Sequence, residues 1–415
     1  MAVVEQPSAT PIAAPARERV QGRTAIVALT LLLGLQPVST DLYLPALPAL
    51  RAALGASAGQ AQFSLSALLL AFGFAQLVAG PLADRYGRRP LLLGGLSLYA
   101  LAGFGGAVAA SIEALVAWRA VQGVGLACAV VCARAMVRDL YAPRDGMTAM
   151  SRGLTGLGIV ALACPLAGAL VAVGLGWRAT LAVLGIYAAG ALGFVALRVP
   201  ETAPALRLDA LQPARLAAAW WRIVRHRQFR AYTALTACTY GGVFAFLAGS
   251  PFVLIEVLGR SSLDCGLVVA SSSVAYVAGT VVCRRWLARF GPRGTVARGA
   301  WLSLAGGLSM AALAAADVRS IWAVVLPQLL YAVGHGQHQP CGQAGAVGAF
   351  PQEAGAAASL AGFALAVTAF AIGSYLGWRF DGTPRALAYT VGGCAVATAL
   401  VAWTWVQRDG EPAQV

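Results

Sequence analysis

The chain consists of long apolar blocks separated by short polar connections. A helix needs about 20 predominantly apolar residues to span a bilayer, and blocks of that length recur along the whole sequence. A membrane β-barrel would instead show alternating segments of about ten residues. We therefore predict an all-α membrane protein with twelve transmembrane helices, at residues 24–46, 60–83, 90–110, 114–136, 150–174, 178–198, 230–255, 264–288, 296–316, 320–349, 354–377 and 386–407.

Two short sequences recur at nearly the same spacing. LADRYGRR at 82–89 is echoed by LARFGPR at 287–293, and GWR at 176–178 returns at 377–379. The offsets of about 204 and 201 residues indicate two pseudo-symmetric six-helix bundles, at 24–198 and 230–407. Parallel six-helix repeats are typical of rocking transporters whose substrate site lies near the membrane midplane. The remaining segments are predicted as a disordered cytoplasmic tail (1–23), a linker with an amphipathic basic segment (199–229) and a second cytoplasmic tail (408–415).

The composition supports a membrane protein and indicates its orientation. The chain is 59% hydrophobic and 11% charged, and all thirty of its basic residues are arginine. Of these, 23 fall on one predicted side of the membrane and six on the other, which places both termini in the cytoplasm by the positive-inside rule. The net charge of +14 is explained by this topology and does not require a nucleic-acid partner. The eight cysteines form no CxxC pair, so we interpret them as packing residues.

The connection GPLADRYGRRP at 80–90 resembles the signature loop between helices 2 and 3 of the major facilitator superfamily. The resemblance implies that superfamily's fold. We interpret the loop as a cytoplasmic latch in which Asp84 meets either the N-terminal end of helix 354–377 or Arg138. The alternative is a basic loop that only sets topology. The predicted latch residues are Gly80, Asp84, Arg85, Gly87, Arg88 and Arg138.

Two further elements are similar to the same superfamily. RAVQG at 119–123 resembles its R-x-x-Q-G element, and an arginine inside the membrane should face the protein interior, with Gln122 one turn away. The alternative is that Arg119 snorkels to the outer surface. Gly156, Pro165 and Gly168 resemble the glycine- and proline-rich element of antiporters, in which small residues let helices 5 and 8 pack closely. Tight packing alone is the alternative.

STDLYLPALPAL in helix 1, ARAMVRDLY in helix 4, VPET after helix 6 and GSPFVLIE in helix 7 look like the bicyclomycin/chloramphenicol-resistance branch of drug:proton antiporters. The resemblance covers residues 24 to 405. It implies proton-driven export from a bacterial cell across the inner membrane, and it does not identify the compound.

Asp41 is the candidate proton site. It lies in the outer half of the first helix, at a depth compatible with that of Arg119. Burial favours the neutral form of a carboxyl group and a nearby arginine favours the charged form, so a pair formed by the two residues would be poised between both. The alternative is that Asp41 only caps the helix end.

Aromatic walls with a few polar groups suit a pocket for amphipathic drugs. In helix 10, His335 and His338 lie one turn apart where related sequences resemble G-x-G-x-x-x-P-N. They are interpreted as proton-relay or substrate residues, with polar packing or a soft-metal site with Cys341 as alternatives. The predicted substrate-binding residues are Tyr43, Phe72, Gln76, Tyr240, Phe244, Phe246, His335 and His338.

The sequence therefore predicts a proton-coupled exporter of small amphipathic drugs or metabolites that works by alternating access. No long loop or catalytic cluster indicates an enzyme. The expected partners are a small-molecule substrate, protons and the lipid bilayer, with no cofactor, no resident metal and a monomeric state. The alternatives are an importer of a nutrient, siderophore or metal such as copper, and a membrane-embedded sensor without flux.

Overall fold

The computed structural model describes residues 22–141, 143–207 and 210–410 of the chain. The predicted tails at 1–23 and 408–415 fall mostly outside the described residues. The described residues are almost entirely helical. The elements are α2 (Arg23–Thr40), η1 (Leu44–Ala46), α3 (Leu47–Ala53), α4 (Ala58–Tyr86), α5 (Arg88–Ala107), α6 (Ile112–Leu140), α7 (Pro143–Leu175), α8 (Trp177–Arg198), α9 (Pro213–Arg225), α10 (Arg227–Pro251), η2 (Phe252–Val257), α11 (Ser262–Ala315), α12 (Ile321–Gly348), η3 (Pro351–Glu353), α13 (Ala354–Arg379), α14 (Arg385–Trp403) and α15 (Trp405–Asp409).

Helical segments occupy all twelve predicted spans, with two changes in their boundaries. The predicted first helix ends early, at Thr40, and continues through η1 into α3. The predicted helices 264–288 and 296–316 are joined without a loop in α11, which turns at Gly291. Ten helices of the described chain are long and apolar enough to cross a membrane, and α11, with 54 residues, has length for two crossings. The more polar α12 is not among these ten.

The turn in α11 shows how the sequence repeat becomes a structural repeat. Gly291 has φ 65°, and Gly87, its counterpart between α4 and α5, has φ 100°. Residues with a Cβ rarely adopt positive φ, so a glycine at each position allows the abrupt turn. The N-termini of α4 and α11 are set by capping boxes, which Ser57 forms with Gln60 and Ser261 forms with Asp264.

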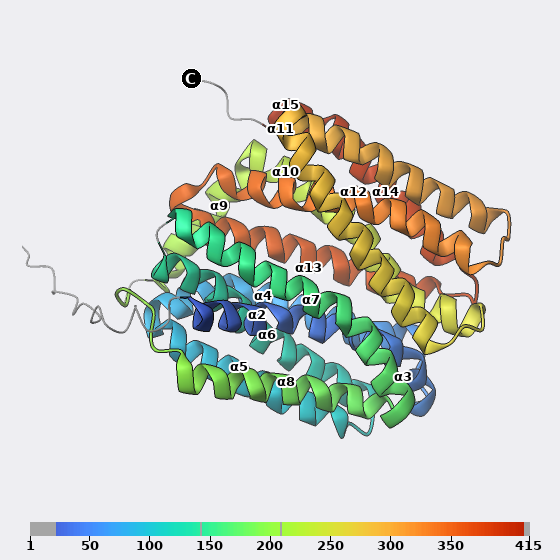
Figure 1. Ribbon diagram of the computed structural model, residues 1–415, viewed down its shortest axis with the longest axis horizontal. Helices are drawn as coiled ribbons and strands as arrows, with labels where there is room; N and C mark the ends of the chain where they lie inside the picture. Colours follow the sequence, from blue (N-terminus) through green and yellow to red (C-terminus); the bar gives the residue numbers. More distant parts are fainter. Residues whose placement is uncertain (1–21, 142, 208–209, 411–415) are drawn as a thin grey trace, which may run out of the picture.

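The helices form two groups that run roughly along the same direction. The blue-to-green helices α2–α8 lie on one side and the yellow-to-red helices α10–α14 on the other (Figure 1). The two groups meet mainly through α4 against α13 and α7 against α11. Small residues allow this approach, because a Cβ on Gly59 would lie 3.1 Å from the carbonyl oxygen of Gly377.

Both ends of the described chain lie at the same end of the bundle, which we call the terminal end (Figure 1). There the N–H of Gly22 donates to the Tyr141 hydroxyl, and the Tyr232 hydroxyl donates to the Gly410 carbonyl. Helix α9, in the segment predicted as a linker, also lies at this end, where Arg222 pairs with Glu353 over 2.8 Å. The opposite end, which carries α3 and η2, is called the far end.

Candidate functional site

Asp41 lies where the first membrane helix breaks. Helix α2 ends at Thr40, and the N–H of Asp41 donates to the Pro37 carbonyl over 2.7 Å before the chain turns towards η1. The carboxyl group is partly buried and accepts a hydrogen bond from Thr40 Oγ1 over 2.7 Å. No basic side chain in the described part of the chain forms an ion pair with it. The result is a carboxyl group inside the bundle that lacks a cationic partner.

Arg119, on α6, is only 1% exposed and is held by three contacts. Its Nη1 donates to Gln122 Oε1 and its Nη2 to the Ser39 carbonyl, each over 2.6 Å. The guanidinium carbon lies 4.4 Å from the centre of the Tyr43 ring. Ser39 and Tyr43 flank Asp41, so Arg119 contacts the backbone on one side of the carboxyl group and a side-chain ring on the other without bonding to the carboxyl group itself.

The predicted pairing of Asp41 with Arg119 is therefore absent among the described residues. The physical reason is the break in α2. Once the helix ends at Thr40, the Ser39 carbonyl has no partner within the helix, and it takes the guanidinium N–H that was expected to reach the carboxylate. Arg119 does face the interior, as predicted, and does not snorkel to the surface.

Helix α7 packs against the Asp41 region through its small residues. A Cβ on Gly168 would collide with the carbonyl oxygen of Leu42, the residue after Asp41. Gly156 lies in the same way against Thr30 of α2. A Cβ on Gly266 of α11 would in turn lie 2.8 Å from the Pro165 carbonyl oxygen of α7. The glycine- and proline-rich element therefore joins the Asp41 turn to the second half of the chain.

Asp41 also lies near the boundary between the halves. It is within electrostatic range of Cys164 on α7 and of Tyr240 on α10. Tyr240 is partly buried, and its ring centre lies 6.4 Å from that of His335 on α12. Tyr240, in the second half, thus lies in the neighbourhood of both Asp41 and His335.

Most of the predicted substrate-binding side chains are not open in this structure. Tyr43, Phe244 and Phe246 are at most 1% exposed, and they pack in the core where η1 and α4 meet the second half. Of the eight, only Tyr240 is partly exposed, and the buried ones are Tyr43, Phe72, Gln76, Phe244, Phe246, His335 and His338. In this conformation these side chains are covered, and their assignment to the substrate site stays a prediction.

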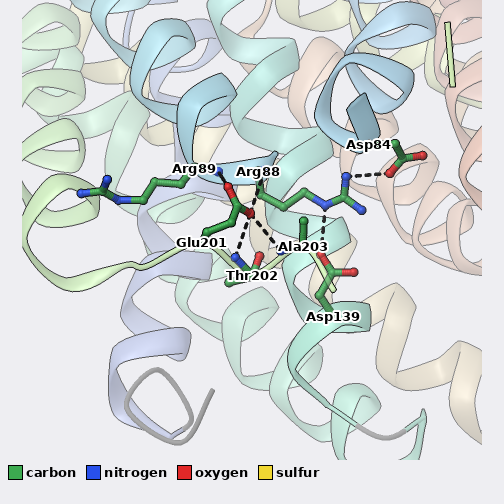
Figure 2. Close-up of polar contacts among 7 residues, drawn as sticks. All are labelled: Asp84, Arg88, Arg89, Asp139, Glu201, Thr202 and Ala203. Atoms are coloured by element: carbon green, nitrogen blue, oxygen red, sulfur yellow. Dashed lines mark hydrogen bonds and ion pairs between the residues drawn. The ribbon is translucent and has the colours of Figure 1, made fainter. Parts of the chain in front are cut away.

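The predicted latch forms an ion-pair chain at the terminal end (Figure 2). Asp84 Oδ1 lies 2.6 Å from Arg88 Nη1, and Arg88 Nε donates to Asp139 Oδ2 over 2.9 Å. Asp84 closes α4, Arg88 opens α5 and Asp139 lies in the last turn of α6. The chain thereby ties three helices of the same half together.

Glu201 completes this network and was not singled out by the sequence. Its carboxylate accepts the N–H groups of Arg88 and Arg89 over 2.9 and 3.1 Å, at the start of α5 (Figure 2). It also accepts those of Thr202 and Ala203, each over 2.8 Å. A carboxylate at a helix N-terminus satisfies unpaired N–H groups and interacts favourably with the helix dipole. The only signal was the glutamate of VPET, whose partners on α5 lie more than 110 residues away.

The latch differs from the prediction in its contact with the second half. Asp84 pairs with Arg88, and no ion pair to Arg138 is found among the described residues. It is Arg138 that reaches the first turn of α13, where its Nη1 lies 3.4 Å from the position of a Cβ on Gly355. Gly80 and Arg85 make no polar contact across the halves in the described part of the chain. Arg88 holds Asp84 because the two residues are four apart in sequence and lie on either side of the tight turn at Gly87.

Comparison with known proteins identifies the fold and the family. The family model described as Major Facilitator Superfamily matches residues 29–374. The chain belongs to the major facilitator superfamily. It is 33% identical to the "Chloramphenicol resistance protein" of Pseudomonas aeruginosa over 318 residues, which cover 75% of this chain and 74% of the relative. It is 30% identical to "Multidrug resistance protein D" of Escherichia coli (strain K12) over 341 residues, 81% of this chain and 84% of the relative.

Solved structures share this fold at low identity. The partially occluded inward-open xylose transporter XylE of E. coli superposes with a TM-score of 0.73 at 16% identity, over 95% of this chain and 98% of that one. An inward-facing bacterial homologue of the human lysosomal transporter Spinster gives 0.72 at 14% identity, over 97% and 100%. The predicted fold class is confirmed, and this major facilitator protein is a membrane transporter, not an enzyme.

The far end of this transporter is closed by an ion pair between its halves. Arg51 on α3 pairs with Glu256 on η2, 205 residues along the chain. Both side chains are about a third exposed, at 32% and 28%. Gln62 Nε2 adds a hydrogen bond to the Ala248 carbonyl over 3.3 Å. Neither residue carries a local sequence signal for this contact, because Arg51 is one of the six arginines on the less basic side and Glu256 is the last residue of GSPFVLIE.

Reversing the charge of Arg51, in Arg51→Glu, is expected to shift the transporter towards opening at the far end. A partly exposed ion pair contributes about 0.2–1 kcal/mol, so the ratio of open to closed forms should rise up to about fivefold. Spin labels at the exposed far-end positions 53 and 260 would report the distance between the halves. The exchange Arg51→Glu with Glu256→Arg should restore the closed distance, and equal distances in all three proteins would contradict a role for the pair.

Proposed function

We propose that this transporter exports small amphipathic drugs or metabolites in exchange for protons, by alternating access across the bacterial inner membrane. The observation that carries the proposal is the Asp41 carboxyl group. It lies inside the bundle, near the boundary between the halves, and has no cationic partner among the described residues. A charge removed from water and left unpaired costs free energy, so binding a proton or a cationic group stabilises the site.

The packing around Asp41 supports coupling between this site and movement of the halves. Gly168 touches the Leu42 carbonyl next to Asp41, and Pro165 on the same helix touches Gly266 of the second half. A change at the Asp41 turn therefore reaches the contact between α7 and α11 through directly touching groups. In our proposal, loading of Asp41 with a proton favours one packing of these helices and substrate favours the other, which is the requirement for exchange.

The proposal also assigns the parts of the chain and their orientation. The two halves, 24–198 and 230–407, rock against each other, and the linker at 199–229 lies on the cytoplasmic side. The terminal end is cytoplasmic, because 23 of the thirty arginines fall on the predicted side of the membrane that holds both termini. With the far end closed by Arg51 and Glu256, the structure then represents a state closed towards the outside. The transporter works as a monomer.

The similarity to relatives named for chloramphenicol and multidrug resistance supports the choice of substrate class. Inside-out vesicles that contain the transporter and hold an acid interior are expected to lose part of their pH gradient when phenicols, bicyclomycin or sulfonamides are added. Vesicles without the transporter are the control. No response to any compound of the panel, with the protein present in the membrane, would contradict proton-coupled drug export. Ligand binding without counterflow would instead indicate a sensor, and substrate accumulation by growing cells an importer.

A further inference from the structure

A polar chain crosses the second half of the transporter through three helices. Thr239 Oγ1, on α10, lies 3.2 Å from His335 Nδ1 and 3.4 Å from His338 Nδ1, both on α12. His338 Nε2 lies 3.2 Å from the Val296 carbonyl oxygen on α11. All three polar side chains are buried, with His335 6% exposed and the other two at 0%.

The carbonyl at one end fixes the direction of every hydrogen bond in this chain. Val296 O only accepts, so His338 Nε2 must carry the proton and its Nδ1 must be the acceptor in the neutral ring. Thr239 then donates its single hydroxyl proton to His338 Nδ1. The contact that remains, between Thr239 and His335, requires His335 Nδ1 to donate. Neutral His335 is therefore left with its lone pair on Nε2.

Nε2 of His335 is the one ring nitrogen of the pair without a hydrogen bond among the described residues, and it is not sealed from the surface. The ring lies near two tyrosines, with Tyr276 on α11 at 5.4 Å and Tyr240 on α10 at 6.4 Å between ring centres. Both tyrosine rings are tilted by less than 40° from the imidazole plane. An acceptor flanked by two aromatic rings suits a flat or amphipathic molecule that carries a hydrogen-bond donor.

Two other roles fit the geometry less well. A proton relay needs an exit, but this chain ends at the Val296 carbonyl, which cannot pass a proton on. A metal site needs further ligands, and no group of three or more histidine, cysteine or acidic residues in the described chain could hold a metal ion. The chain is instead suited to hold His335 in one orientation and one tautomer.

We propose that His335 Nε2 is a fixed hydrogen-bond acceptor for a hydroxyl or amide N–H of the exported molecule, and that Thr239, His338 and the Val296 carbonyl lock it in that state. In this proposal Tyr240, which lies near both His335 and Asp41, is a wall residue shared by the acceptor and the proton site. The substrate class is thereby narrowed to amphipathic molecules with a neutral donor group. This inference rests on the proposed function, because it assigns a contact to the exported compound.

Nitrogen NMR of histidine tests the tautomers directly. The chain has three histidines, so ring-labelled protein gives few signals, and His226→Gln removes the exposed one. At neutral pH we expect His338 protonated on Nε2 and His335 protonated on Nδ1. Thr239→Val should release His335 into a tautomer mixture, whereas His338 should stay protonated on Nε2 because the Val296 carbonyl still accepts from it. Any other dominant tautomer for either ring in the unaltered transporter would overturn the proposed lock.

Binding to purified protein tests the acceptor role, with chloramphenicol as the probe because it carries hydroxyl and amide donors. His335→Gln can place an acceptor near the position of Nε2, whereas the shorter His335→Asn cannot. We expect the dissociation constant to rise about tenfold in His335→Asn, the loss that leaves one buried donor unpaired, and less than about threefold in His335→Gln. In the nitrogen NMR spectrum, a saturating concentration of chloramphenicol should change the chemical shift of His335 Nε2 and leave the signals of His338 unchanged.

The outcomes separate the two proposals. If no compound of the panel binds the unaltered transporter, the proposed function fails. If chloramphenicol binds it and binds His335→Asn equally well, the proposed function stands and the acceptor role is overturned. Thermal unfolding of His335→Gln and His335→Asn identifies a misfolded variant. His226→Gln, which removes a histidine elsewhere, is the control and should bind chloramphenicol as tightly as the unaltered transporter does.

Discussion

Replacing Asp41 with asparagine is expected to abolish gradient-driven transport while leaving substrate exchange intact. For each proton exchanged, a gradient of one pH unit supplies about 1.4 kcal/mol, which corresponds to about tenfold accumulation of substrate. The amide cannot release a proton, so Asp41→Asn should reach equal concentrations on both sides. Proteoliposomes with an imposed pH gradient measure accumulation, and counterflow without a gradient measures exchange.

The matched control is Asp381→Asn, which removes a carboxyl group from the exposed far-end loop. Hydrogen bonds from Thr383 lower the pKa of Asp381, so this group remains charged near neutral pH and does not carry protons. Accumulation by Asp381→Asn should therefore match that of the unaltered transporter. If Asp41→Asn accumulated substrate equally well, Asp41 would not be the coupling residue.

Replacing Arg119 with methionine is expected to cause the largest loss of stability among single substitutions at this site. The change leaves the Ser39 carbonyl and Gln122 Oε1 without a donor in a buried place, and each such loss costs about 1–3 kcal/mol. The expected total is about 2–5 kcal/mol. The stability of Arg119→Lys should lie between that of the unaltered transporter and that of Arg119→Met, because an ammonium group cannot reproduce the planar geometry of the guanidinium.

Thermal unfolding of the purified protein checks this order, with Arg178→Met as the control. Arg178 also donates to a carbonyl, that of Ala109 over 3.2 Å, and also stacks on a tryptophan ring, but it is exposed. Its replacement should cost less than about 1 kcal/mol. Equal melting temperatures for the two methionine variants would contradict the view that Arg119 organises the Asp41 turn.

The sequence predicted the helices well because their signals are local. Long apolar blocks mark spans, and Gly87 and Gly291 stand at equivalent positions of a repeat that the structure turns into equivalent sharp bends. The break of the first helix at Thr40 was harder to place, since Pro37 lies inside α2 and the helix does not stop there. Pro45 instead opens η1, beyond the turn.

The site was predicted only in part, because its contacts depend on which of several nearby acceptors takes a given side-chain donor. The sequence predicts a comparable depth for Asp41 and Arg119, but depth alone cannot show that the freed Ser39 carbonyl takes the guanidinium. Contacts across long separations, such as Arg51 with Glu256 or Glu201 with the start of α5, carry no local pattern at all. The histidines of α12 were noticed for their spacing, whereas their shared partner Thr239 became visible only in three dimensions.

The central claim, that substrate and proton displace one another through Asp41, is tested most directly by proton release. Purified transporter in a weakly buffered detergent solution with a pH indicator is titrated with a compound that binds it. We predict acidification on binding to the unaltered transporter and none on binding to Asp41→Asn, at equal occupancy. Binding without proton release at any pH between 5 and 8, or equal release from both proteins, would contradict the account.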